Sequence, residues 1–128
     1  MAQVYKCTSE LRDGIEVFSL SEGEFAVAEI APALGNNCFS IYMHDEPVLE
    51  TVSLHEFVKR PTSYGIPILF PFPNRIRDGK FVFQGETYTV DPPRHGFVRD
   101  KPWEVVGHGA SVEEGAWLTS GFDASSYT

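Results

Sequence analysis

The stretch that decides the fold is EVFSLSEGEFAVAEI, residues 16–30. Here and along most of the chain, apolar residues recur at period two more than at the helical period, which is typical of β-strands. Turn-forming residues, Gly23 among them, interrupt the apolar residues at 21–24. The sequence therefore predicts a hairpin with strands at 16–20 and 25–30.

Further short apolar runs follow, separated by Gly, Pro, Asn and Asp about every ten residues. They predict strands at 38–43, 48–50, 80–83, 87–90, 103–106 and 111–119, with a loop at 31–37 and a turn at 44–47. A single helix is predicted at 53–60, because Ser53 is a good N-cap, Glu56 follows it by three residues, and Pro61 ends the segment. One short helix among strands indicates an all-β, antiparallel architecture.

The composition is that of an ordinary globular protein. The chain has 128 residues, of which 42% are hydrophobic and 22% charged, and its formal net charge is −8. Its Lys and Arg residues are scattered, so nucleic acid is not an expected partner. The N-terminus lacks the apolar stretch of a signal peptide, and the apolar run at 66–72 is short and broken by prolines, so we expect a cytoplasmic protein without a membrane partner. Cys7 and Cys38 are expected to be reduced, because no Cys-x-x-Cys pair is present.

The end of the chain differs from the rest. After a strand-like run, residues 120–128 have a polar, turn-like composition and provide no capping element. A hairpin that ends before its partner strand would have this appearance.

The segment from residue 64 to 103 is richest in residues that could bind a ligand. Pro67, Pro71 and Pro73 exclude a central strand, so we expect a rigid loop that presents Asn74 and Arg75. The guanidinium of Arg75 suits two neighbouring hydroxyls or a carboxylate. The alternative is a structural turn in which Arg75 pairs with a nearby carboxylate, Asp78 or Asp91.

His95 lies on a second loop, after two prolines and before Gly96. An imidazole can exchange hydrogen bonds with a sugar oxygen and transfer protons near neutral pH, although the residues alone favour an ordinary surface-loop histidine at this position. The other histidines are weaker candidates. A metal site at His44 is not favoured because adjacent residues on a strand point to opposite sides, His55 falls on the predicted helix surface, and His108 falls in a predicted turn at 107–109.

Aromatic residues surround this segment. They are expected mainly in the core, although one of them could instead form an apolar platform for a sugar ring. The residues concerned are Phe70, Phe72, Phe97 and Trp103.

Several motifs of this region together resemble the aldose 1-epimerase (galactose mutarotase) family. They are GIPILFPFPNRIRDG at 65–79, FQGETY at 83–88, HGFVR at 95–99 and PW at 102–103. Their order and spacing are similar to those of the family, and the resemblance covers most of the chain. HGFVR is also similar to the related hexose-6-phosphate 1-epimerases.

The resemblance implies a β-supersandwich with a sugar-binding cleft, and interconversion of α and β anomers of a hexose without a cofactor or metal. Carried over by motif, Arg75 would hold sugar hydroxyls, Asn74 would support Arg75, and His95 would contact the sugar near its reacting centre. The partner would be a small-molecule hexose or hexose phosphate, with Arg94 and Arg99 as candidates to contact a phosphate.

One departure from the family pattern concerns catalysis. In the family, the histidine assigned as general acid and the glutamate assigned as general base lie well beyond the His-Gly motif. His108 comes too early to match, and the glutamates at 113–114 fall in a predicted hairpin. We therefore expect residues 1–128 to be the N-terminal part of a single mutarotase-like domain, truncated at its C-terminus and inactive alone. The alternatives are a noncatalytic carbohydrate-binding β-domain and a reading frame without a stable fold. The sequence leaves the sugar and the oligomeric state open.

Overall fold

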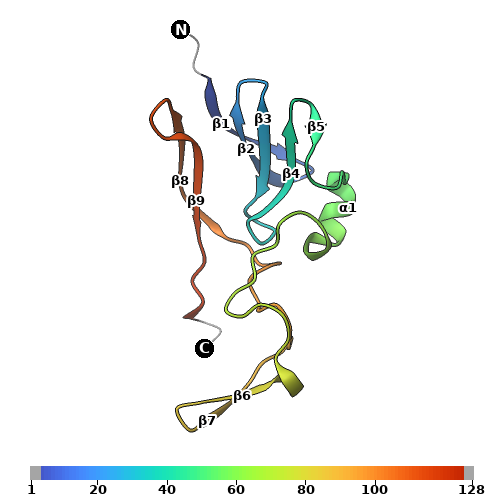
Figure 1. Cartoon of the computed structure of the whole chain (residues 1–128), viewed down its shortest axis with the longest axis vertical. Helices are drawn as coiled ribbons and strands as arrows, with labels where there is room; N and C mark the ends of the chain where they lie inside the picture. Colours follow the sequence, from blue (N-terminus) through green and yellow to red (C-terminus); the bar gives the residue numbers. More distant parts are fainter. Residues whose placement is uncertain (1–3, 126–128) are drawn as a thin grey trace.

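A computed structural model describes residues 4–125 and shows a five-stranded antiparallel sheet whose strands neighbour one another in chain order (Figure 1). The predicted hairpin at 16–30 is confirmed as its second and third strands. An additional strand precedes them, joined through a turn at Asp13 and Gly14, whose φ values are 52° and 81°. The strands are β1 (Tyr5–Arg12), β2 (Ile15–Glu22), β3 (Ala26–Ala31), β4 (Asn37–Met43) and β5 (Glu46–Pro47).

The strand predicted at 48–50 is wrong, because pairing with β4 begins and ends earlier, at Glu46–Pro47. His44 and Asp45 adopt left-handed conformations, with φ of 52° and 64°. They make a tight turn by themselves, so the next two residues already pair with Met43 and Tyr42. Only the bond from the Val48 N–H to the Ile41 carbonyl continues the pairing.

The predicted helix is confirmed as α1 (Leu54–Lys59), which covers one face of the sheet. The Ser53 side chain accepts a hydrogen bond from the Glu56 N–H at 3.2 Å, which is the predicted N-cap. Phe57, fully buried, stacks on Phe39 of β4 with ring centroids 4.7 Å apart. Val17 of β2 completes the centre of this core. A 3-10 turn, η1 (Pro61–Ser63), follows the helix.

A hairpin of β8 (Glu104–Ser111) and β9 (Gly115–Gly121) packs against β1 and β2 as a second layer. The antiparallel all-β architecture is thereby confirmed. The turn predicted at 107–109 is wrong, since these residues lie within β8 and the turn comes at 112–114. Carbon atoms of the Trp117 indole lie 3.2 Å from where a Cβ would stand at Gly107 and at Gly109. The two glycines therefore accommodate a large ring on the neighbouring strand.

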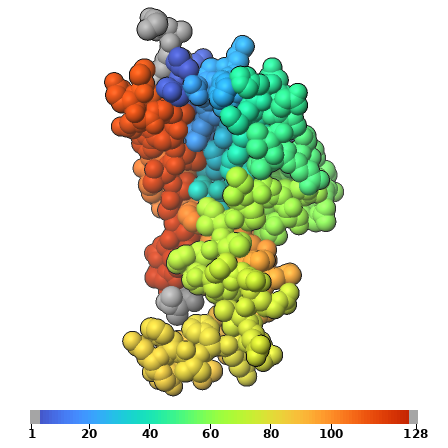
Figure 2. Space-filling view, in the orientation of Figure 1, coloured from blue at the N-terminus to red at the C-terminus, as the bar shows by residue number. Residues whose placement is uncertain are grey.

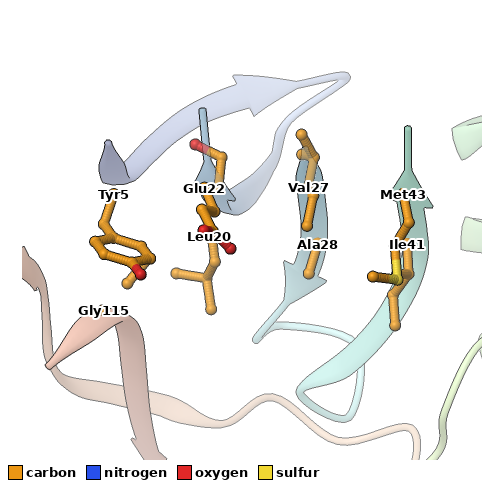
Figure 3. Close-up of a pocket in the computed structure, with 11 residues that line it drawn as sticks. Tyr5, Leu20, Glu22, Val27, Ala28, Ile41, Met43 and Gly115 are labelled. Carbon is orange, nitrogen blue, oxygen red and sulfur yellow. The ribbon is translucent and has the colours of Figure 1, made fainter. Parts of the chain in front are cut away.

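The second layer covers only part of the sheet. Between them is a largely apolar hollow of about 340 Å³, which Leu20, Ala28 and Ile41 line from the sheet and Gly115 and Ala116 line from β9 (Figure 3). Cys7 and Cys38 are half-buried free thiols, as expected.

A second hairpin, β6 (Lys80–Phe83) and β7 (Glu86–Thr89), projects from the body of the molecule (Figures 1 and 2). It confirms the prediction for this segment, and a turn, η2 (Arg77–Gly79), precedes it. All eight strand residues are exposed. The Phe81 and Tyr88 rings stack on each other across the strands, with centroids 5.3 Å apart. No helix in the part of the chain that the structure describes is long and apolar enough to cross a membrane.

Candidate functional site

Two loops, residues 70–76 and 93–97, are bound to each other through their backbones on either side of the projecting hairpin. The Phe97 N–H donates to the Phe70 carbonyl at 3.0 Å, and the Ile76 N–H donates to the Pro93 carbonyl at 2.7 Å. Residues 66–76 contain no helix or regular strand, which confirms the predicted loop. The pairing brings Asn74 and Arg75 beside His95, although 20 positions separate Arg75 from His95 in the sequence.

The imidazole of His95 has a defined orientation. Its Nδ1 accepts a hydrogen bond from the Asn74 N–H at 3.1 Å, and the backbone N–H of His95 donates to the Asn74 carbonyl at 2.7 Å. Because Nδ1 is an acceptor, the ring proton of the neutral form must be on Nε2. Nε2–H is therefore the donor that His95 can offer to a ligand. His95 is half-buried rather than a freely rotating surface side chain.

Three residues at this junction adopt left-handed backbone conformations, namely Asn74, His95 and Gly96, with φ of 57°, 63° and 70°. Gly96 is buried, and a Cβ there would overlap the Phe70 carbonyl and stand 3.0 Å from the Phe70 nitrogen. Only glycine permits this approach of the two loops.

Arg75 is exposed. Among residues 4–125 it forms an ion pair with neither Asp78 nor Asp91, so the alternative of a structural ion pair is not observed. Instead, these three residues line a common surface hollow of about 440 Å³, together with residues of η2 and β7. His95 does not line this hollow. The structure thus brings Arg75 and His95 onto joined loops without enclosing both in one cavity.

Arg94 is the antiparallel bridge partner of Arg75. Side chains directly opposite each other in an antiparallel pair lie on the same face, and like charges in that position repel each other. Both residues are exposed. The bridge therefore places two cations on one face of the paired loops, and such a face suits an anionic ligand. Arg99, the other candidate for a phosphate contact, is half-buried.

The remaining histidines lie away from this junction. His44 is in the turn after β4, where its ring contacts Phe25 with centroids 4.3 Å apart, and His55 is exposed on α1 as predicted. His108 is on β8, edge-to-face with Phe18 and 3.8 Å from the Cys7 sulfur. Within residues 4–125, no three His, Cys, Asp or Glu side chains are grouped so that they could hold a metal ion.

Of the two roles that the sequence leaves open for these aromatic residues, the core is excluded for Phe70, which is 50% exposed. Its backbone pairs with Gly96 and Phe97, and its ring lies at the surface. Phe72, Phe97 and Trp103 are half-buried, and the Trp103 indole N–H donates to the Val98 carbonyl at 3.1 Å. Phe70 is the member of this group placed to serve as an apolar platform.

The sequence profile of the family described as aldose 1-epimerase matches residues 16–125. The chain belongs to this family. The matched region includes both loops of the junction, so Asn74, Arg75, His95 and Arg94 all lie within it. Membership in this family implies a sugar substrate.

Two features of the junction were not foreseen from the sequence. One is the pairing of Arg75 with Arg94, and the other is the hydrogen bond that orients His95. Both depend on how the two loops align, and the only local signal was a pair of turn-favouring residues, Asn74 and Gly96, at the points of contact.

Proposed function

We propose that this chain supplies the sugar-binding part of an aldose 1-epimerase that interconverts the α and β anomers of a hexose. The observation that carries the proposal is the hydrogen bond from the Asn74 N–H to His95 Nδ1. It leaves the proton of a neutral imidazole on Nε2, in a chain of the epimerase family. The imidazole Nε2–H and the guanidinium of Arg75, on the joined loop, are both donors suited to sugar oxygens.

The proposed reaction requires two proton transfers. An acid protonates the ring oxygen while a base takes the proton of the anomeric hydroxyl, and the bond between the anomeric carbon and the ring oxygen breaks to give an aldehyde. The aldehyde rotates, and the same steps in reverse close the ring on its other face. In this scheme Arg75 holds neighbouring hydroxyls, and His95 donates from Nε2 to an oxygen near the anomeric carbon.

We further propose that the principal acid and base lie outside these 128 residues. His108 is exposed on β8 and contacts Phe18 and Cys7, and the glutamates at 113–114 lie in the turn of the β8–β9 hairpin, so none of them belongs to the two paired loops. By this proposal the chain is the N-terminal part of the catalytic domain, binds sugar, and does not accelerate anomer exchange alone.

A hexose phosphate is the second candidate substrate, and the Arg75–Arg94 pair is what favours it. A phosphate between two guanidiniums would accept bidentate hydrogen bonds and relieve their mutual repulsion. If this candidate holds, Arg94→Ala should lower affinity for the phosphorylated sugar and leave affinity for the free hexose nearly unchanged.

The test is an NMR titration of the ¹⁵N-labelled chain with glucose, galactose and glucose 6-phosphate at millimolar concentration. Arg75→Ala and His95→Ala should each weaken binding by about tenfold, the loss expected for one or two hydrogen bonds to a ligand. His55→Ala, on the exposed face of α1, is the matched histidine control and should bind normally. Equal affinities for all four proteins would refute the assignment of the site.

Anomer-exchange NMR on the same samples separates the alternatives. The proposal expects exchange at the rate of buffer for this chain, and acceleration when it is expressed within a longer family polypeptide that carries the missing acid and base. Acceleration by the 128-residue chain alone would contradict the proposed absence of the catalytic pair. Binding without acceleration in the longer polypeptide would instead support a noncatalytic carbohydrate-binding domain.

A further inference from the structure

Asn37, at the start of β4, is fully buried, and both ends of its amide are used. Its Nδ2 donates to the carbonyls of Pro61 and Tyr64 at 3.0 and 2.9 Å, and its Oδ1 accepts from the Ile66 N–H at 2.8 Å. A buried amide with both donors and an acceptor paired holds its partners firmly, since an unpaired polar group in the interior is costly. One side chain thus fixes three points of a single loop.

Residues 65 and 66 of this loop pass close to the Asn37 side chain and to β4. A Cβ at Gly65 would overlap the Asn37 Oδ1 and stand 2.8 Å from the Phe39 Cα, and Gly65 has a φ of 69°. Ile66 also forms a bridge with Cys38, through a bond from its N–H to the Cys38 carbonyl at 3.0 Å. The backbone therefore passes directly over Asn37 before it leaves the sheet.

From Ile66 the chain runs to Arg75 through a segment that contains three prolines, at 67, 71 and 73. Its next backbone attachment is at Phe70, which joins Gly96 and Phe97. Because proline restricts φ, displacement at the start of such a segment is absorbed poorly by rotation within it. A shift at Ile66 should consequently reach the pairing of the two loops.

Asn37 itself is held by the core. It is the register partner of Ala31 at the end of β3, and Ala31 is fully buried in the cluster around Phe57. The amide therefore connects the well-packed sheet to a loop whose far end lies in an exposed part of the molecule.

We propose that Asn37 is a positioning residue for the sugar site, acting through residues 61–66 on the loop that carries Asn74 and Arg75. The assignment of the site rests on the proposed function, whereas the mechanical coupling does not. Loss of the Asn37 amide should loosen the bond between the Asn74 N–H and His95 Nδ1 in molecules that remain folded.

The test compares Asn37→Ala with Val17→Ala, which makes a cavity in the same core but removes none of the hydrogen bonds that hold the loop. Two signals report on the junction in the absence of sugar, the ¹⁵N shift of His95 Nδ1 and the hydrogen-exchange rate of the Asn74 amide. Asn37→Ala should move the ¹⁵N shift and speed Asn74 exchange by about tenfold under native conditions, the change expected for loss of about one hydrogen bond. Val17→Ala should leave the ¹⁵N shift unchanged, and it should speed Asn74 exchange by no more than its loss of global stability accounts for. Unchanged signals in Asn37→Ala would overturn the proposal.

Should Asn37→Ala not fold, native-state exchange of the unmodified chain in increasing urea decides the question. The amide hydrogens of Ile66 and Asn74 should then exchange through the same opening reaction, with the same dependence on urea. Exchange of Asn74 through an opening that leaves Ile66 protected would overturn the coupling. Sugar titration adds a separate readout: Asn37→Ala should weaken binding in proportion to the loosened junction. Coupling without any sugar binding by the unmodified chain would refute the proposed function and leave the positioning role intact.

Discussion

Replacement of Gly96 by alanine tests whether close contact of the two loops builds the site. The native φ of 70° places a non-glycine residue in the left-handed region, at a cost of about 1–2 kcal/mol. The new Cβ would also overlap the Phe70 carbonyl, which accepts the Phe97 N–H, and displacing that carbonyl would cost about 1 kcal/mol more. Gly96→Ala should therefore lower the free energy of unfolding by about 2–3 kcal/mol in total.

Gly14→Ala is the matched control. Gly14 has a φ of 81°, and a Cβ there would meet nothing within 4 Å, so only the backbone cost of about 1–2 kcal/mol applies. Urea unfolding followed by tryptophan fluorescence measures both variants, with the slope m checked for constancy. A Gly96→Ala variant that is no more destabilised than Gly14→Ala would show that close contact with Phe70 does not contribute to stability. If the hydrogen bond from the Asn74 N–H to His95 Nδ1 is lost in Gly96→Ala and kept in Gly14→Ala, the stability change is linked to the site.

Three further predictions concern the scaffold. Ser53→Ala should remove the N-cap of α1 and lower stability by about 1 kcal/mol in urea unfolding, whereas the exposed Ser63→Ala should have little effect. Gly109→Ala should push the Trp117 indole aside, because the Cβ would stand 3.2 Å from it, and near-ultraviolet circular dichroism should change with a loss of about 1 kcal/mol. Burial raises the pKa of the Cys38 thiol. The unfolded thiol therefore loses its proton at lower pH than the folded one, so stability should fall as pH rises above the unfolded pKa, and this part of the pH dependence should be absent in Cys38→Ala.

Local rules were sufficient for much of the fold. The N-cap at Ser53 and the turns at Gly23 and Gly85 depend on neighbours within a few residues, so the sequence predicts α1 and two hairpins where they are found. Local rules fail at residues 107–109, which were predicted as a turn and lie within β8. The two glycines that flank His108 favour a turn by themselves, and only the indole of Trp117 on the next strand explains why they belong to β8.

In the candidate site, too, features set by nearby residues were predictable and features set by distant residues were not. The rigid loop before Asn74 was predictable from its prolines, because proline acts on its own backbone. The orientation of His95 and the approach of Arg94 to Arg75 require the alignment of two loops separated by a hairpin, which no local pattern encodes. The apolar ring of Phe70 left open whether it belongs to the core or forms a platform, and only the structure shows that it is exposed.

The junction is held mainly by backbone contacts rather than by the buried core. Its links, from Phe70 to Phe97, Asn74 to His95 and Ile76 to Pro93, lie between the sheet and the exposed hairpin of β6 and β7. An isolated two-stranded hairpin is at best marginally stable in water, so β6 and β7 can add little to hold the loops together. On the core side, each loop has a buried attachment, the Asn37 amide before one and Val98 after the other. Asn37→Ala removes such an attachment and Val17→Ala does not. At equal cost in stability, Asn37→Ala should therefore weaken sugar binding more than Val17→Ala.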